Sequence, residues 1–251
     1  MIRTGTLEKA REGRRHLVLP NGSGYWRNGL ITTPPDAAVG LPAERALAPQ
    51  AFLVEQDPGT TIEPHFHQEN EFQVIVEGDG FLGRHVVEPV RVHYAGAHTG
   101  YGPVIAGPKG LSYFTLRART DPGAQFLPGA RDKMAKGRKR HLLARAWPPL
   151  PAADLAVNGG SEATALWEPQ HDGIGAWVLR VAPNHAASVP GHAAASRYLL
   201  VIGGALMMNG ERLPRFAAVF ISNNETPALC AAKEGLELLV LEFPGTQEEW
   251  T

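Results

Sequence analysis

Two histidines and a glutamate lie within seven residues of one another in the first half of this 251-residue chain. His65 and His67 are two residues apart, so on a strand both imidazoles project from one face, while Phe66 projects from the other. The polar residues 68–70 can turn the chain, so that Glu71 opens the adjacent antiparallel strand beside the histidines. Two imidazoles and a carboxylate form a mixed N/O set that suits Fe(II), Mn, Ni, Cu or Zn and leaves coordination positions open. The spacing therefore predicts a site for a divalent metal.

A fourth ligand is expected from a later segment, in which two histidines compete for the role. His98 shares its strand parity with a mostly apolar row, which is the face expected to point inward. That row consists of Val90, Val92, Tyr94, Gly96 and His98. His93 shares the parity of Arg91 and is expected to look outward. We take His98 as the fourth ligand and His93 as the alternative, because a β-bulge would reverse the argument.

Two further side chains are candidates for contact with a substrate. Gln73 has the parity of Glu71, so it is expected to point to the same side and to supply a hydrogen bond to a ligand or substrate. Tyr101 opens a Gly/Pro-rich segment, 101–108, that is expected to form a rim loop near the metal. Its hydroxyl could orient a substrate or oxygen, although most tyrosines in such places pack in a core or rim.

The elements that must position these groups are strands. Residues with apolar side chains alternate with others at period two in six segments, which are 71–76, 90–94, 111–116, 198–202, 217–221 and 236–243. The 28 glycines and 21 prolines are scattered between these short runs rather than gathered in one tract. Short alternating strands with frequent turn residues predict an all-β chain that forms a sandwich or barrel in each half.

An internal repeat sets the domain organisation. When the chain is shifted by 125 residues, Ala51-Phe52-Leu53-Val54 falls on Ala176-Trp177-Val178-Leu179, Pro58 on Pro183, Gly78 on Gly203, and Gly110-Leu111 on Gly235-Leu236. We therefore expect two tandem barrels, at 46–120 and 161–245, after an N-terminal arm at 1–45. The segment 121–160 between them is expected to be a linker, and its basic stretch Lys136-Gly137-Arg138-Lys139-Arg140 a solvated connector.

The second copy has lost most of the ligand set. The same shift places Pro190 on His65, His192 on His67, Ser196 on Glu71 and Asn223 on His98. A single imidazole with these neighbours cannot hold a divalent ion tightly. One metal ion per chain is therefore expected, with the second barrel serving as a packing partner.

The composition narrows the class of protein. With 20% charged residues and a net charge of −1, the chain has no long-range field that would draw it to nucleic acid or to an anionic membrane. The single cysteine, Cys230, excludes an internal disulfide and is expected to be a small buried side chain. The first residues lack the apolar stretch of a secretory signal, and no apolar run is long enough to span a membrane, so a cytoplasmic location is expected.

The stretch Gly59 to Gly78 resembles the first signature motif of the cupin superfamily, G-x5-H-x-H-x3-E-x6-G, with every fixed position filled. The second motif, G-x5-P-x-G-x2-H-x3-N, is matched only in part by Tyr94-Ala95-Gly96-Ala97-His98-Thr99, which lacks the proline, the asparagine and one residue of spacing. The resemblance implies small jelly-roll barrels with a metal inside the first, as in two-barrel cupins whose other site is degenerate. Dimers are common in that superfamily, which is the only basis for expecting a homodimer.

Three functions compete. The motif resembles that of cupin oxygenases, which favours an enzyme for dioxygenase-type oxidation of a small organic molecule. Such an enzyme would use one divalent metal, with Fe(II) the first candidate. A metal-dependent isomerase or lyase is the catalytic alternative, since this fold hosts several chemistries. A binding or sensing cupin without turnover is the third.

Overall fold

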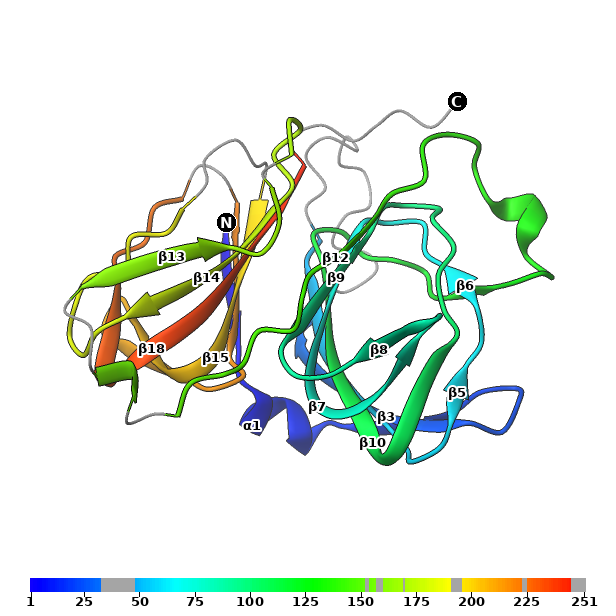
Figure 1. The fold of residues 1–251 in the computed structure, drawn as a ribbon, viewed down its shortest axis with the longest axis horizontal. Coiled ribbons are helices and arrows are strands. Elements are labelled where there is room, and N and C mark those ends of the chain that lie inside the picture. The colour runs from blue at the N-terminus through cyan, green and yellow to red at the C-terminus, as the bar shows by residue number, and fades with distance from the viewer. Residues whose placement is uncertain are drawn as a thin grey trace. The chain divides into compact units, whose positions relative to one another are not determined.

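The computed structural model describes residues 1–32, 48–151, 154–156, 160–168, 170–190, 196–222 and 225–244. The chain separates into two compact units, an N-terminal unit of residues 10–147 and a C-terminal unit made of residues 1–9 and of the described residues between 148 and 244. Each unit is built from antiparallel strands (Figure 1), and the described residues contain one α-helix, α1 (Leu7–Glu12). The prediction of an all-β fold is thereby confirmed. No helix in the described ranges has the length and apolar character needed to cross a membrane.

A nine-stranded sheet forms the N-terminal unit, in the order β12-β9-β7-β10-β4-β3-β2, with β5 paired to β10 and β8 paired to β7. Its strands are β2 (Arg15–Val18), β3 (Gly24–Ile31), β4 (Gln50–Gln56), β5 (Thr61–Ile62), β7 (Glu71–Leu82), β8 (His85–Val87), β9 (Arg91–Ala95), β10 (Val104–Arg117) and β12 (His141–Leu143). The short strands β6 (His65–Phe66) and β11 (Gln125–Phe126) pair with each other. A 3-10 turn, η2 (Arg131–Lys133), lies between β11 and β12.

The C-terminal unit contains a seven-stranded sheet in the order β1-β17-β15-β18-β14-β13, with β16 paired to β15. Its strands are β1 (Ile2–Gly5), β13 (Ser161–Ala165), β14 (Gly175–Val181), β15 (Ser196–Met208), β16 (Glu211–Pro214), β17 (Ala218–Ser222) and β18 (Leu229–Phe243), and a 3-10 turn, η3, covers Asp154–Ala156. Buried aliphatic side chains of β14, β15, β17 and β18 form its core.

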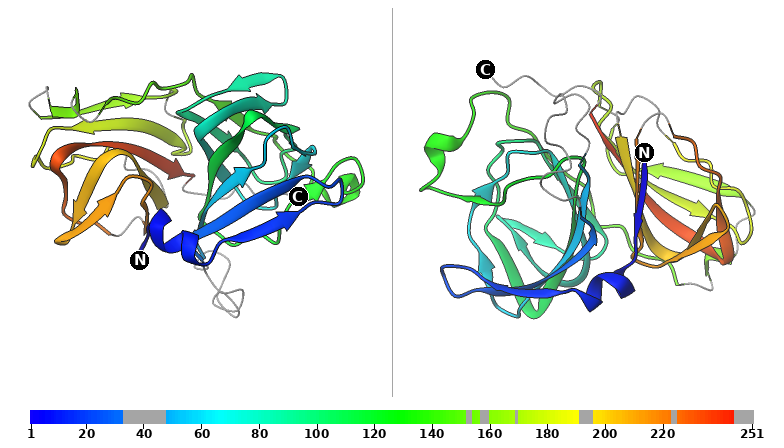
Figure 2. Two further views of the ribbon diagram at one scale, coloured as in Figure 1. Left: turned by 90° about the horizontal axis from the view of Figure 1, so that it is seen from below. Right: turned by 180° about the vertical axis from the view of Figure 1, so that it is seen from behind.

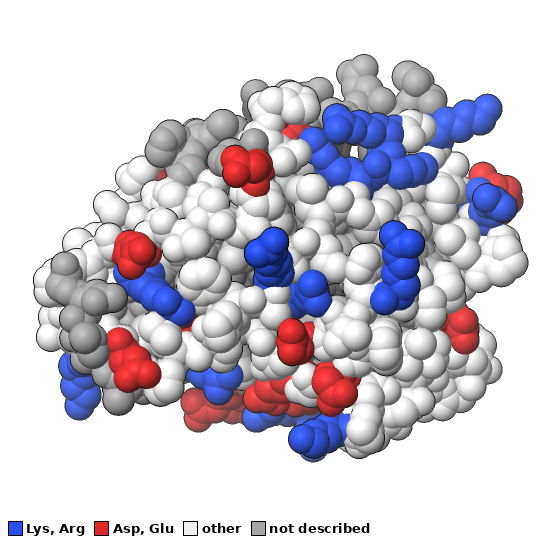
Figure 3. Space-filling view, viewed as in Figure 1, with Lys and Arg blue, Asp and Glu red and all other residues white. Residues whose placement is uncertain are grey.

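Both flanking segments take part in the sheets. Within the segment 1–45, β1 pairs with β17, and the hairpin β2–β3 (blue in Figure 2) lies alongside β4. Within 121–160, β11 and β12 extend the strands of the N-terminal unit. Residues 136–139 are exposed, whereas Arg140 is buried. Figure 3, in the orientation of Figure 1, shows Lys and Arg side chains gathered at its upper right and mixed charges elsewhere on this face.

The two units repeat the same internal contacts, but not at one constant shift. The rings of Phe72 and Tyr94 meet at 5.0 Å and 60°, and those of Tyr198 and Phe220 meet at 5.1 Å and 60°. These pairs are 126 residues apart, whereas β10 and β18 correspond at 125 residues, since Leu111 pairs with Gly78 and Leu236 with Gly204. The expectation that Ser196 stands in the place of Glu71 was therefore wrong by one residue, and that place belongs to Arg197.

Two glycines mark corresponding places in the two units where neighbouring strands approach closely. Gly78 has a φ of +78°, and a Cβ on it would lie 2.1 Å from the carbonyl oxygen of Gly110. Gly204 has a φ of +64°, and its Cβ would lie 2.0 Å from the carbonyl oxygen of Gly235. Neither position can carry a side chain without both a strained backbone and a displaced strand. The glycine that ends the first motif is thus required by the path of the chain.

Gly78→Ala is expected to lower the free energy of unfolding of the N-terminal unit by about 2–5 kcal/mol, because left-handed strain adds to overpacking. Gly59→Ala is the matched control, since Gly59 also has a positive φ of +69° but nothing lies within 4 Å of its Cβ position. That control is expected to cost only about 1–2 kcal/mol. Urea denaturation measures both changes, and equal losses would contradict the close-approach explanation.

Candidate metal centre

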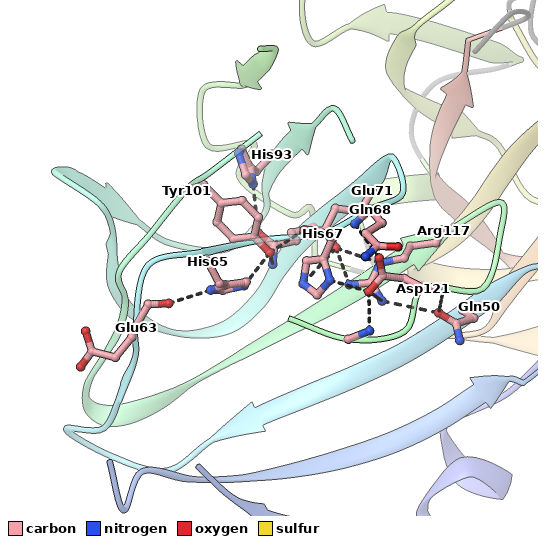
Figure 4. A network of polar contacts seen from close by, with 12 residues as sticks. Gln50, Glu63, His65, His67, Gln68, Glu71, His93, Tyr101, Arg117 and Asp121 are labelled. Carbon is pink, nitrogen blue, oxygen red and sulfur yellow. Dashed lines mark hydrogen bonds and ion pairs between the residues drawn. The ribbon is translucent and has the colours of Figure 1, made fainter. Parts of the chain in front are cut away.

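The residues of the first motif meet at the inner wall of the N-terminal unit. His65 belongs to β6, Glu71 begins β7, and Tyr101 forms an antiparallel bridge with His65 just before β10. His65, Gln73 and Tyr101 line a cavity of about 380 Å³. Figure 4 shows His65 and Glu71 converging on the Tyr101 hydroxyl. All of them are buried or nearly so. The structure therefore brings together His65, Glu71, Gln73 and Tyr101, as well as His67 in the same wall.

The tautomer of His65 is fixed by its backbone neighbour. Its Nδ1 donates to the carbonyl oxygen of Glu63 at 2.7 Å, so the lone pair of Nε2 faces the hydroxyl of Tyr101 at 2.9 Å. Burial, followed by the charge of His67, lowers the pKa of His65 to about 4, so this imidazole is neutral at pH 7. A neutral imidazole whose Nδ1 is held by a carbonyl presents Nε2 as a ligand.

His67 is oriented by a carboxylate from beyond β10. Its Nδ1 lies 2.6 Å from Oδ1 of Asp121, whose other oxygen accepts from the backbone N–H of Gln68 at 2.8 Å. Nε2 of His67 is left facing Glu71, with 3.9 Å to Oε2. A carboxylate behind an imidazole fixes the ring and raises its basicity as a ligand. Both histidines thus present Nε2 toward the same region.

Glu71 is a fully buried carboxylate with two different partners. Its Oε1 accepts from the Tyr101 hydroxyl at 2.5 Å, and its Oε2 accepts from Arg117 at 2.6 Å and 3.0 Å. Burial alone would raise the pKa of Glu71, but the charges of His67 and Arg117 and the Tyr101 hydrogen bond outweigh it and hold that pKa at about 2. Burial and the charge of Glu71 raise the pKa of Tyr101, which stays a neutral phenol.

An imidazole nitrogen and a carboxylate oxygen, donor types that bind divalent cations, meet at the Tyr101 hydroxyl. Nε2 of His65 and Oε1 of Glu71 both face the Tyr101 hydroxyl, which has one hydrogen and can satisfy only one of them. The hydroxyl oxygen lies 2.9 Å from Nε2 of His65 and 2.5 Å from Oε1 of Glu71, which are hydrogen-bond distances. Among the described residues, no three His, Cys, Asp or Glu side chains suffice by themselves to hold a metal, so the oxygen of Tyr101 has to join the set or move aside.

The structure places His98 away from this cluster. β9 ends at Ala95, and His98 has a φ of 54° in the turn that follows. Its ring lies 5.6 Å from that of Phe66, the residue on the opposite face from His65, and its Nδ1 accepts from the N–H of Ala135 at 3.2 Å. The prediction of His98 as the fourth ligand was therefore wrong, because strand parity does not extend through the turn.

His93 points inward, contrary to the expectation. Its Nδ1 lies 3.0 Å from Oε1 of Gln73, its Nε2 lies 3.0 Å from Nδ1 of His141, and its ring is 5.2 Å from that of Tyr101. The parity argument failed because both faces of this sheet are buried, and the more apolar face, which carries Val92, looks away from the cavity. Both ring nitrogens of His93 have side-chain partners, and its ring packs against that of Tyr101.

Sequence reasoning missed three contributors to the site. Arg117 shares the parity of Tyr113 and Thr115, so extending that row by one step would have reached it. Asp121 and His141 lie in the segment interpreted as a linker, which carries no periodicity that would signal them. They enter the site because the chain after β10 folds back over the barrel as β11 and β12.

The C-terminal unit carries apolar side chains at the corresponding inner positions. With the shifts given above, Gln73 corresponds to Leu199, His93 to Val219, Tyr113 to Leu238 and Thr115 to Val240, all members of the buried core. Glu71 and Arg117 correspond to Arg197 and Glu242, which form the reversed ion pair at 3.2 Å. His192, the ligand expected to survive, and Asn223 lie outside the described residues.

Solved structures resemble the whole chain at low identity. A candidate dioxygenase from Nostoc punctiforme has a TM-score of 0.66 and 11% identity, and the match covers 99% of this chain and 85% of that one. Bacterial pirin YhhW from Escherichia coli, in complex with nickel(II), has a TM-score of 0.55 and 15% identity over 98% of this chain and all of the other. Salicylate 1,2-dioxygenase from Pseudaminobacter salicylatoxidans has a TM-score of 0.55 and 13% identity, covering 96% and 83%.

These neighbours are cupins, and the matches run across both units of the chain. No protein-family model and no curated protein sequence matches it. At such identities the likeness concerns the fold. The chain therefore has the two-barrel fold of the cupins.

Proposed function

We propose that this protein is a metal-dependent oxidoreductase that uses one divalent metal in its N-terminal unit for dioxygenase-type oxidation of a small organic molecule. The observation that carries the proposal is the convergence of His65, His67 and Tyr101 on one side of a cavity of about 380 Å³, with Glu71 hydrogen-bonded to Tyr101. Its structural neighbours include dioxygenases, which supports the choice among cupin chemistries. Fe(II) is favoured, and Mn, Ni, Cu and Zn suit the same donors.

The residues of the chain have separate tasks in this proposal. His65 and His67 supply Nε2 and Glu71 supplies a carboxylate oxygen, while Arg117 balances the second oxygen of that carboxylate. Bound there, the metal would supply Lewis acidity or one-electron chemistry toward dioxygen. Tyr101 lies beside His65 and Glu71, where its hydroxyl can orient a reacting oxygen. Gln73 donates to that hydroxyl at 3.2 Å and fixes its position.

The polarity of the two units explains why one site is proposed rather than two. Tyr113, Thr115 and Gln73 give the N-terminal cavity polar atoms beside apolar walls, whereas leucine and valine fill the matching places in the other unit. Ligand cavities combine a mostly apolar lining with a few placed polar groups. The apolar core has no such groups at these positions and serves stability.

A second candidate is a binding protein that captures a ligand without turnover. The ion pair between Glu71 and Arg117 favours it, because an oxygen engaged by a guanidinium is a poorer ligand for a metal. In that case Tyr101 and Gln73 would contact the ligand directly. The partner is in either case a small molecule, and a homodimer is the proposed assembly.

Oxygen uptake distinguishes the two candidates. Protein loaded with Fe(II) is mixed with diketones, catechols, hydroxybenzoates and thiols, and consumption is followed with an oxygen electrode. We expect uptake with one class and a loss of at least about 100-fold in the His67→Ala variant, which lacks a proposed ligand. His85→Ala, an exposed histidine, is the matched control and should keep full activity. No uptake with any class would refute dioxygenase chemistry and favour isomerase, lyase or binding functions.

A further inference from the structure

The cavity beside the proposed metal site is lined by three arginines. Arg15 on β2 and Arg27 on β3 lie directly opposite each other in the register of the hairpin, and Arg117 reaches the same cavity from the end of β10. Like charges opposite each other on neighbouring strands destabilise a sheet. The arrangement is therefore costly unless a negative charge joins it. Glu71 forms an ion pair with Arg117, so the charges that remain to be balanced are those of the two hairpin arginines.

Arg27 is the half-buried member of that hairpin pair. Its guanidinium carbon lies 4.1 Å above the centre of the Phe52 ring. Within the described ranges, no hydrogen bond or ion pair reaches its side chain. Burial lowers the pKa of Arg27, and the charges of Arg15 and Arg117 lower it further, yet a guanidinium stays protonated at neutral pH. The side chain is thus a partly desolvated cation held by a ring rather than by an anion.

The rest of the cavity sets the kind of anion that fits. Apolar side chains form most of its wall, among them Leu17, Val54, Ile62 and Phe126. Protein cavities of about 150 Å³ hold one benzene molecule, so the volume of about 380 Å³ admits one substituted ring beside the metal site. Tyr113 also lines this space, and among the described residues no hydrogen bond ties its hydroxyl to another side chain.

We propose that the cavity binds a small organic acid whose carboxylate pairs with Arg27 and whose apolar, ring-sized body lies along Phe52 toward Tyr101. The planar fork of a guanidinium matches a carboxylate with two parallel hydrogen bonds, and Phe52 already holds the fork in place. Arg15 adds a second positive charge at the exposed end of the cavity. As the substrate class of the oxidation this inference rests on the proposed function, but binding of the acid requires no metal.

The test is calorimetric titration of the full-length, metal-free protein with benzoate and benzamide, which share a ring and differ in charge. Wild-type protein should bind benzoate at least about 10-fold more tightly than benzamide. Arg27→Gln should weaken benzoate binding about 10-fold to 100-fold and leave benzamide unchanged, and Arg27→Lys should restore part of the loss. Arg14→Gln is the matched control, because Arg14 stacks on Trp26 and is not among the cavity-lining residues.

Three results would overturn the assignment. They are equal affinities for benzoate and benzamide, an Arg27→Gln variant that keeps the preference while its circular dichroism and melting match wild type, and tighter binding of phenyl phosphate than of benzoate. The titration tests the acid site separately from the proposed oxidation, because it uses metal-free protein and measures binding alone. If benzoate binding depends on Arg27 but no compound causes oxygen uptake, the proposed acid site is supported and the proposed oxidoreductase function is refuted.

Discussion

Replacing Arg117 with methionine is expected to lower the free energy of unfolding of the N-terminal unit by about 3–5 kcal/mol. The substitution keeps much of the volume but leaves the carboxylate of Glu71 buried without a cation, and both side chains are at most 5% exposed. A buried charge that loses its partner either stays ionised at high cost or takes up a proton. Equilibrium urea denaturation of the wild type and of Arg117→Met measures the difference.

Two controls separate the loss of charge balance from a loss of packing. The double variant Glu71→Gln/Arg117→Met removes both charges and is expected to recover most of the stability, since apolar or neutral replacements of a buried ion pair are often tolerated. Arg11→Met breaks an ion pair with Glu55 whose side chains are 51% and 22% exposed, so it should cost less than about 1 kcal/mol. A double variant no more stable than Arg117→Met would contradict the electrostatic explanation.

The largest functional effect is expected on metal affinity. Asp121→Asn removes the charge behind His67 and should weaken metal binding about 10-fold to 100-fold, as loss of such outer partners does. His67→Ala removes a proposed ligand, so its loss should exceed that of Asp121→Asn. Competition with a chelator of known affinity, read at pH 7, gives both values.

His85→Ala supplies the matched control for this series, since His85 is exposed on β8. Its metal affinity should equal that of the wild type. An Asp121→Asn variant that binds metal as tightly as the wild type would show that Asp121 does not orient a ligand. A His67→Ala variant with unchanged affinity would remove His67 from the site.

Local sequence periodicity was sufficient to predict the strands and the first part of the site. His65 lies on β6 and His67 directly after it, while Glu71 and Gln73 lie on β7, so alternation of side chains decides most of their directions. The prediction needed no knowledge of distant contacts. A sandwich or barrel in each half followed from the same alternation and from the glycines that separate the strands, whereas the jelly roll was what the resemblance to the cupin motif implied.

The parts that failed depend on events that alternation does not record. The turn after Ala95 takes His98 out of parity, and burial of both sheet faces made His93 look like an outward residue. A shift of one residue between the copies moved the counterpart of Glu71 from Ser196 to Arg197. Each of these changes involves only one or a few residues, but a shift of one residue is enough to turn a side chain to the other face of a sheet.

The remaining contributors come from segments without a sequence signal. Asp121 reaches His67 from 54 residues away, and His141 reaches His93 from 48 residues away. Such contacts depend on the path of the chain after β10, which tertiary packing determines. Tyr101 was expected at the rim and lies instead at the centre of the hydrogen bonds that join His65, Glu71 and Gln73.

The central claim is that His65, His67 and Glu71 hold a divalent metal ion in the N-terminal unit. Elemental analysis by mass spectrometry, on protein purified with Fe(II) and freed of loosely bound ions, tests it most directly. We expect about one metal ion per chain in the wild type and in His85→Ala, and close to none in His65→Ala/His67→Ala. A wild type without bound metal, or a double variant that retains the full amount, would contradict the claim.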